Sequence, residues 1–460
     1  MRALKAWEKI YNLGPGAVWV LRYPCALTSP RRHRLSLVHQ GYYRPIVPTA
    51  EPAMRLLLTG GTIYASPTEG PMKDGVVVIR DGKIAAVGPR ASVRVPEGVP
   101  TLDCSGLTIV AGFWNSHVHF FERKWGDAAN LPAPELAGQL QAMLTRYGFT
   151  TVFDTGSPWE NTRRIRDRIE SGELPGPRIR STGEALLGKG WLPPAPILRA
   201  LGYMQFPTPE VENASGALAA AKRILESGTD GLKVFAAAPS PPFAPLPDGA
   251  IRAAVEEAHR RNKLVFVHPS SRDGLLAAVE GGVDVIAHTT PDSASWDEPL
   301  LAAMRRAKVV VVPTLKIFKY QLRHDRASLG ESRARTGVAQ LRAWVASGGV
   351  VLFGTDVGGM DDYDTSEEYE LMAEAGMTFR QILASLTTAP AERFGDSGRL
   401  GRIAPGHVAD LVVLSGDPSQ DVRAFAAVRY TIRDGKLIHS TEFRHAPRSV
   451  PRSGESDAEP

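Results

Sequence analysis

The centre of the chain alternates short runs of β-branched residues with longer stretches of helical periodicity, and this alternation constrains the fold most strongly. Eight strand-like runs follow one another: TIVAGFWNSHVHF, FTTVFDTG, PRIRSTGEAL, DGLKVFAAA, KLVFVHPS, VDVIAHTT, VVVVPTLKI and GVVLFGTDVG. Several of the intervening stretches, such as ELAGQLQAMLTRYG and GAIRAAVEEAHRRN, close with glycine or asparagine, as helices commonly do. Eight strand-helix units in about 285 residues predict an α/β fold, a (β/α)8 TIM barrel over residues 112–397. A doubly wound open sheet is the alternative, but no glycine-rich dinucleotide fingerprint follows an early strand.

The two ends of the chain share a different pattern, in which short β-runs are separated by turns. Asp81-Gly82 and Asp434-Gly435 each lie between apolar runs, and this residue pair favours a two-residue type I′ hairpin turn. We therefore expect residues 54–111 and 398–440 to form one small composite β-sandwich beside the central domain.

The outermost segments lack such patterns. Residues 1–53 show no sustained periodicity and are interpreted as an irregular N-terminal extension. This extension is either an artefact of the start site, with Met54 as the physiological beginning, or an arm that packs on a partner subunit. Residues 441–460 are polar and rich in proline, which predicts a disordered tail.

Charge, cysteine content and hydropathy exclude several classes of protein. The chain has 54 lysines and arginines against 49 acidic residues, and the basic excess is concentrated near its two ends. No basic recognition motif is present, so we predict no nucleic-acid partner. Two cysteines, Cys25 and Cys104, exclude a disulfide scaffold, and no run approaches the ~18 apolar residues of a membrane span. We expect a cytoplasmic homo-oligomer without membrane association.

Four histidines fall at the ends of predicted strands. His117 and His119 end the first strand, His268 ends the fifth and His288 ends the sixth. Residues two apart in a strand point to the same side, so His117 and His119 can bind one metal ion together. Each histidine alone could be an ordinary core or surface residue. Because the reactive groups of a barrel gather at the carboxyl ends of its strands, the four together predict a metal site.

Two further residues interrupt apolar runs that we expect to be buried: Lys233 on the fourth strand and Asp356 on the eighth. An ammonium group cannot bind a cation, but a buried lysine loses its proton readily and can then react with carbon dioxide to form a carbamate with two metal-binding oxygens. The alternatives for Lys233 are a structural salt bridge or a clamp for a substrate carboxylate. Asp356 is either a metal ligand that takes a proton from water or a helix N-cap.

These motifs resemble the amidohydrolase superfamily of metal-dependent hydrolases, and within it the branch similar to imidazolonepropionase and prolidase. The resemblance rests on GFWNSHVHF, GLKVF, VHPSS, VDVIAHTT, GTDVG and the tail GRIAPGHVADLVVL, and it extends from about Met54 to His439. It implies two divalent metal ions, with zinc expected. His117 and His119 would bind the more buried ion, His268 and His288 the second, and Lys233 carboxylated by CO2 would bridge them. Asp356 would bind the first ion and act as general base and acid.

One departure from the family pattern bears on the type of reaction. Deaminase-like members with one metal ion have a glutamate shortly after the histidine of the fifth strand. Here Pro269, Ser270, Ser271 and Arg272 follow His268, which disfavours deamination.

We therefore predict a metal-dependent amidohydrolase that cleaves a C–N bond through a metal-activated hydroxide, with a small-molecule substrate such as an N-acyl amino acid, a dipeptide or an aryl amide. The alternatives are a mononuclear deaminase, a cyclic amide or lactone hydrolase, and a catalytically silent scaffold. Candidate substrate contacts in or near the loops are Lys189, Trp191, Phe243, Lys316 and Tyr320. The two lysines Lys189 and Lys316 would suit a substrate that carries a carboxylate.

Overall fold

The computed structural model of the chain describes residues 55–189, 202–205, 208–236, 246–247, 249–293, 295–323 and 326–442. The predicted N-terminal extension, nearly all of the predicted tail, and the candidate substrate residues Trp191 and Phe243 lie outside these described residues. No helix within the described ranges is both long enough and apolar enough to cross a membrane.

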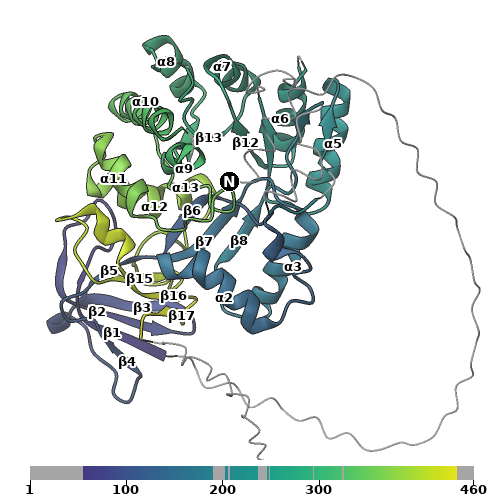
Figure 1. Cartoon of the computed structure of the whole chain (residues 1–460). Coiled ribbons are helices and arrows are strands. Elements are labelled where there is room, and N and C mark those ends of the chain that lie inside the picture. The colour runs from purple at the N-terminus through teal and green to yellow at the C-terminus, as the bar shows by residue number, and fades with distance from the viewer. Residues whose placement is uncertain are drawn as a thin grey trace, which may run out of the picture.

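Parallel strands form the centre of the molecule (Figure 1). One sheet contains β6 (Phe113–Val118), β7 (Phe149–Asp154) and β8 (Arg178–Ser181), and a second contains β11 (Gly231–Phe235), β12 (Leu264–His268), β13 (Val285–Ala287) and β14 (Val310–Val312). Isolated parallel bridges pair Leu186 with Val234, Val311 with Val351, and Val118 with Val357. The predicted α/β centre is confirmed. Because the strands are parallel, their carboxyl ends lie on one side.

The eighth predicted strand, GVVLFGTDVG, departs from regular strand geometry. Its pairing consists of isolated bridges, and the amide of Phe353 donates to the carbonyl of Ser385 on α12 (Phe379–Leu386) instead of to a strand. Gly354 lies so close to its neighbours that an added Cβ would come within 2.3 Å of Val312 and 2.9 Å of His117. Close packing beside β6 therefore shapes this segment.

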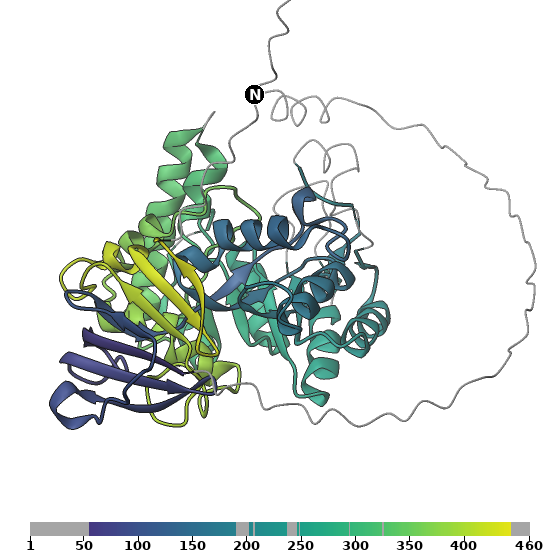
Figure 2. The same cartoon turned by 90° about the horizontal axis from the view of Figure 1, so that it is seen from below.

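Helices follow the strands and lie around them (Figure 1, Figure 2). Their bounds are α2 (Ala133–Met143), α3 (Trp159–Glu170), α5 (Ala214–Glu226), α6 (Ala250–Arg260), α7 (Arg272–Gly281), α8 (Glu298–Arg306), α9 (Lys316–Leu322), α10 (Ala327–Ala346), α11 (Ser366–Glu374) and α13 (Thr388–Arg393). Short elements are η1 (Arg90–Ser92), η2 (Arg123–Trp125), η3 (Thr145–Tyr147), η4 (Val422–Ala426), β9 (Leu187–Gly188) and β10 (Glu210–Val211). Side chains of Asn213, Ser271 and Asp297 accept backbone N–H bonds at the starts of α5, α7 and α8.

Strands from both chain ends join in one mixed sheet, in which purple and yellow ribbons lie side by side (Figure 1). Its members are β1 (Arg55–Ile63), β2 (Met72–Arg80), β3 (Lys83–Pro89), β4 (Thr101–Asp103), β5 (Thr108–Ala111), β15 (Leu411–Leu414), β16 (Val428–Arg433) and β17 (Lys436–Ser440). The two ends meet where β15 pairs antiparallel with β5. Asp81 and Gly82 have φ of 51° and 73°, and Asp434 and Gly435 have φ of 50° and 74°, as type I′ turns require.

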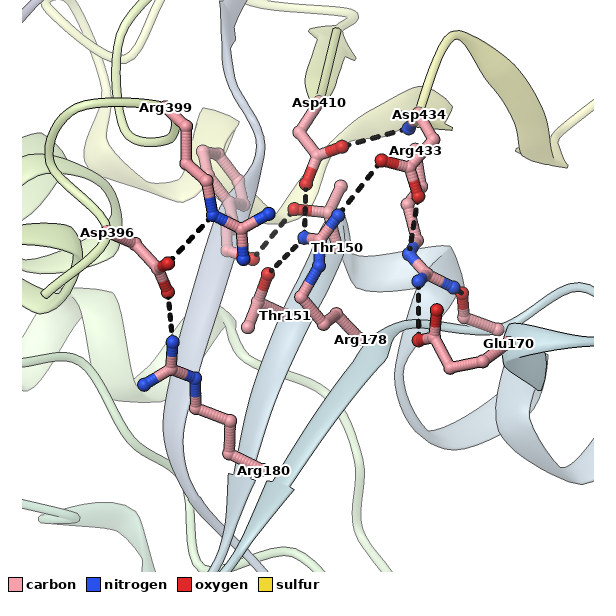
Figure 3. A network of polar contacts seen from close by, with 12 residues as sticks. Thr150, Thr151, Glu170, Arg178, Arg180, Asp396, Arg399, Asp410, Arg433 and Asp434 are labelled. Atoms are coloured by element: carbon pink, nitrogen blue, oxygen red, sulfur yellow. Dashed lines mark hydrogen bonds and ion pairs between the residues drawn. The ribbon is translucent and has the colours of Figure 1, made fainter. Parts of the chain in front are cut away.

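A polar network joins this mixed sheet to the central strands (Figure 3). Arg178 on β8 contacts Asp410 at 2.9 Å and Asp434 at 3.0 Å, and Asp410 also accepts the amide of Asp434. Nearby, Arg433 on β16 pairs with Glu170 at the end of α3. The side chains of Arg178 and Asp410 are only 12% and 5% exposed, so water screens their charges little.

We expect an Arg178→Met variant to lose about 3 kcal/mol of unfolding free energy, because the substitution leaves the buried Asp410 carboxylate without its cationic partner. Urea denaturation followed by circular dichroism measures this loss. Arg399→Met is the matched control, since Arg399 is 50% exposed and should contribute about 1 kcal/mol or less. Equal, small losses in both variants would contradict a role for Arg178 in holding the sheet to the strands.

Candidate metal centre

The six predicted ligands all lie at or near the carboxyl ends of the central strands. His117 is in β6 and His119 follows it, His268 ends β12, and His288 comes directly after β13. Lys233 is the middle residue of β11, and Asp356 lies in the irregular segment before Val357. Five of the six are buried, and His268 is partly buried. Adjacent parallel strands therefore bring these side chains to one end of the central sheets.

Three of these residues form a compact group. Ligand atoms of His117, His119 and Asp356 all lie within 4.8 Å of one another. The Nε2 atom of His119 is 2.8 Å from Oδ1 of Asp356, and Nε2 of His117 is 3.5 Å from the same oxygen. A carboxylate and two imidazoles at these distances provide the donor types that zinc-like ions prefer.

The other two histidines continue this group. The ring centroids of His117 and His288 are 4.7 Å apart, and those of His268 and His288 are 4.5 Å apart. Nδ1 of His288 lies 3.8 Å from Oδ2 of Asp356. The charge of Lys233 lowers the pKa values of His117, His268 and His288, and the charge of Asp356 opposes the lowering of the Lys233 pKa. The structure thus brings all six predicted ligands into one neighbourhood.

Several polar atoms of the centre are buried without a hydrogen-bond partner among the described residues. They are both ring nitrogens of His117, Nδ1 of His119 and Nζ of Lys233. A buried polar atom that makes no hydrogen bond costs about 1–3 kcal/mol. An imidazole coordinates a metal ion through one ring nitrogen, so divalent ions bound here would satisfy some of these atoms, and the residues present fit a metal site.

Burial sets the protonation of the site. It lowers the pKa of His117, His268 and His288, with the charge of Lys233 adding to the effect, and the pKa of His268 falls to about 3. These imidazoles are therefore neutral near pH 7, which is the form that binds metal. Burial also lowers the pKa of Lys233 to about 7, against the opposing charges of Asp356 and Asp154. A neutral amine is consequently available near neutral pH.

The backbone is strained at this site. Non-glycine residues with positive φ include His288 at 73°, Asp356 at 62° and Thr314 at 46°, and the last of these is β-branched. Such conformations cost of order 1–3 kcal/mol each and cluster where function demands a fixed side-chain direction. Gly358, with φ of 98°, lies so near His119 that an added Cβ would be 2.3 Å from its carbonyl oxygen. The motif GTDVG therefore allows the close approach of the Asp356 segment to the histidine strand.

Two residues near the candidate ligands were not predicted from the sequence. Asp154, the last residue of β7, is fully buried and accepts hydrogen bonds from the hydroxyls of Ser157, Ser181 and Thr162. Burial raises its pKa to about 6 in spite of these bonds. Ser157 also accepts the amide N–H of Phe120 at 2.8 Å, so Asp154 tethers the residue next to His119. The position of Asp154 at the end of β7 was the signal in the sequence that could have revealed this residue.

Thr314 is the second missed residue. Its Oγ1 lies 2.6 Å from Nδ1 of His288 and donates to the carbonyl of Pro313 at 2.9 Å. With its hydrogen donated to Pro313, Oγ1 can accept an Nδ1–H of His288. This contact favours the tautomer whose free lone pair is on Nε2. No short motif in the sequence marks a contact between residues 26 positions apart.

The candidate substrate residues that the structure describes have protein partners. Lys189 is exposed and pairs with Glu212 at 2.7 Å. Lys316, at the start of α9, is buried, and its Nζ contacts Oδ2 of Asp362 at 2.9 Å. The hydroxyl of Tyr320 makes a short hydrogen bond to Asp361. Their contacts with substrate stay predictions.

Comparisons with known proteins show to which family the chain is similar. The family model described as the amidohydrolase family matches residues 108–438. The chain is 27% identical to an ochratoxinase of Aspergillus niger, over 86% of this chain and 89% of that protein. It is 24% identical to an imidazolonepropionase of Porphyromonas gingivalis, over 81% of this chain and 90% of that protein. The crystal structure of a Xaa-Pro dipeptidase with bound methionine superposes with a TM-score of 0.70 and 24% identity, covering 83% of this chain and 99% of that one.

The similarity to solved structures supports a TIM-barrel fold with mixed α and β structure, as the alternation of strands and helices predicted. The family match covers well over half of the chain, and it spans all six residues of the centre. The predicted family and reaction class are thereby confirmed. The chain belongs to the amidohydrolase family and is a metal-dependent hydrolase that acts on a carbon–nitrogen bond.

Proposed function

We propose that this chain hydrolyses an amide to a carboxylic acid and an amine, using two divalent ions, zinc by expectation, held by His117, His119, Lys233, His268, His288 and Asp356. The observation that carries this proposal is the gathering of four histidines, one carboxylate and one lysine of lowered pKa, with buried nitrogens that have no hydrogen-bond partner in the part of the chain that the structure describes. A metal ion bound here would polarise the scissile carbonyl and lower the pKa of a bound water toward about 7.

The ligands divide into two sets. His117, His119 and Asp356 would hold the first ion, since these three form the compact group. His268 and His288 would hold the second. Lys233 would bridge the two ions as a carbamate, which forms when its neutral amine adds to carbon dioxide and releases a proton.

Asp356 would move the proton. Its Oδ1 contacts both histidines of the first set, whereas Oδ2 faces His288 at the longer distance of 3.8 Å. We assign Oδ2 as the atom that accepts a proton from the attacking water and returns it to the leaving nitrogen. Such a shuttle contributes typically about 10²- to 10⁴-fold to rate.

Two alternative reactions remain in the proposal. The imidazolonepropionase similarity favours hydrolysis of a cyclic amide as a second candidate. A mononuclear deaminase is disfavoured by Pro269 and Ser270, which occupy the positions after His268. Metal analysis separates the carbamate-bridged hydrolase from these rivals, because about two ions per chain favour the former and one favours a deaminase or a ring-opening hydrolase.

The finer structural expectations also belong to this proposal. The central strands would close into a (β/α)8 barrel over residues 112–397, and residues 54–111 with 398–440 would form the β-sandwich. A cytoplasmic location and a homo-oligomeric state are proposed from the sequence alone.

The test is a screen of N-acyl amino acids, dipeptides, aryl amides and cyclic amides with protein that has been stripped by a chelator and reloaded with zinc. We expect one class of amide to be cleaved, with loss of activity on stripping and recovery on reloading. Zinc-loaded protein that cleaves no amide, or cleavage that the chelator leaves unchanged, would refute the proposal.

A Thr314→Val variant should bind zinc about 10- to 100-fold more weakly, because valine cannot accept the Nδ1–H of His288 and the imidazole loses its fixed tautomer. Competition with a chromophoric chelator measures the affinity. Thr336→Val is the matched control, since the Thr336 hydroxyl bonds to a helix carbonyl on the exposed surface of α10. Unchanged zinc affinity in Thr314→Val would show that the contact does not position His288.

A further inference from the structure

Six aromatic or imidazole rings form an unbroken series through the centre. In order they are Phe235, His268, His288, His117, His119 and Phe121, and each ring centroid lies 4.5–5.0 Å from the next. The four histidines occupy the middle of the series, and a phenylalanine stands at either end. The two phenylalanines therefore flank the candidate metal centre.

Both phenylalanines lie beside candidate ligands. Phe235 and Lys233 are two apart in β11, so their side chains share a side and Phe235 lies closer to the carboxyl end of the strand. Phe121 follows the end of β6, and its ring centroid lies 4.5 Å from that of His119. The alternate residue, Phe120, is fully buried and packs on Trp125 instead. Phe121 and Phe235 are partly exposed, whereas His117 and Lys233 beneath them are buried.

Neighbouring contacts hold the two rings in place. Tyr203 packs edge-on against Phe121 at 4.8 Å, and its hydroxyl donates to the carbonyl of Gly359 at 3.3 Å. The amide of Met204 also bonds to the carbonyl of Phe121. Phe235 lies nearly parallel to His268, with 14° between the ring planes. Rings fixed in this way can recognise a flat apolar group without much loss of conformational entropy.

Three lysines of the described part of the chain already have carboxylate partners. Lys124 pairs with Glu122 at 2.7 Å, and Lys316 pairs with Asp362 at 2.9 Å. Lys189 pairs with Glu212. A substrate carboxylate would have to displace a protein carboxylate from any of these three lysines, and the expectation of an acidic substrate is weakened accordingly.

We infer that Phe121 and Phe235 determine specificity, and that the substrates of this centre are amides with an aryl ring next to the scissile carbon–nitrogen bond. This inference rests on the proposed function and narrows its substrate class. The aryl ring could belong to the acyl part or to the amine part, and both would present the same flat apolar surface to the two phenylalanines.

The experiment compares zinc-loaded wild type with Phe121→Leu and Phe235→Leu, because leucine keeps apolar volume but removes the ring. Two substrate pairs are used: N-(2-naphthoyl)glycine with N-acetylglycine, and acetanilide with N-cyclohexylacetamide. We expect each variant to lower the aryl-to-alkyl ratio of kcat/KM about tenfold in at least one pair, and the pair that responds shows which side carries the ring. Comparing the ratio of a variant with that of wild type cancels the intrinsic reactivity of each amide.

Phe379→Leu is the matched control, since Phe379 is also partly exposed but packs on Tyr64 away from the ligands. It should leave the ratio unchanged, and all variants should keep the zinc content of wild type. Unchanged ratios in both Phe121→Leu and Phe235→Leu, with zinc retained, would overturn the inference while amide hydrolysis itself stood.

If no amide in these pairs is cleaved, that result counts against the proposed function but not against recognition by the two phenylalanines. A binding measurement then tests that recognition. Zinc-loaded proteins are titrated with 2-naphthoate, followed by its fluorescence, and with cyclohexanecarboxylate as competitor. We expect 2-naphthoate to bind wild type more tightly than the competitor, and Phe121→Leu or Phe235→Leu to weaken its binding about tenfold. Equal Kd values for 2-naphthoate in all proteins would refute recognition by these rings.

Discussion

An Asp356→Asn variant should hydrolyse its amide substrate about 10³-fold more slowly in kcat than the wild-type protein. Asparagine has nearly the shape of aspartate, so the segment of positive φ around residue 356 should keep its conformation, which asparagine also tolerates. It cannot take a proton from water or return it to the leaving nitrogen. Steady-state kinetics at saturating zinc measures the loss, and zinc analysis of the same samples separates lost proton transfer from lost metal.

Asp361→Asn is the control for this variant. Asp361 lies five residues further along the same segment, with its side chain 76% exposed, and its loss should change kcat by about twofold at most. An Asp356→Asn protein that keeps its zinc and retains kcat near that of wild type would exclude Asp356 as the proton-transfer group.

Lys233→Ala should lose most of the activity and about one zinc ion per chain, because alanine offers no oxygens to bridge two ions. We expect kcat/KM to fall on the order of 10³-fold, because the two metal ions can no longer be held together. Zinc is measured by mass spectrometry on the samples used for kinetics. Full zinc content together with full activity in Lys233→Ala would show that the bridging role is wrong.

The protonation of Lys233 gives this prediction a pH dependence. Its pKa is lowered to about 7, so the amine is mostly charged at pH 6 and mostly neutral at pH 8. Only the neutral amine reacts with carbon dioxide. Reactivation of metal-free protein by zinc, at the same concentration of dissolved carbon dioxide at both pH values, should therefore be about tenfold faster at pH 8 than at pH 6. Equal rates at the two pH values would contradict carbamate formation on a lysine of lowered pKa.

The candidate ligands stand out in the sequence because each breaks a local rule. His117, His268 and His288 end apolar β-runs, and Lys233 places a charge inside one. Such residues are rare in buried strands unless a site requires them. The alternation of strands and helices then implied that these strand ends would meet. The α/β architecture followed from this alternation, and the family and reaction class followed from the resemblance of the motifs to the amidohydrolase superfamily.

Features that depend on contacts between distant residues could not be predicted. The pairing of Lys316 with Asp362 spans 46 residues, and no local pattern indicates that it occupies the ammonium group. The bond from His288 to Thr314 and the irregular geometry around Gly354 also arise from packing between segments. Tertiary packing decides such contacts, and a single sequence carries little information about it.

The zinc content of the full-length protein at equilibrium with excess zinc, after removal of unbound metal, tests the central claim most directly. If His117, His119, Lys233, His268, His288 and Asp356 hold a pair of ions, mass spectrometry should find about two zinc ions per chain, and His117→Ala should reduce that number. Wild-type protein that retains no zinc, or the same zinc content in His117→Ala, would contradict the account.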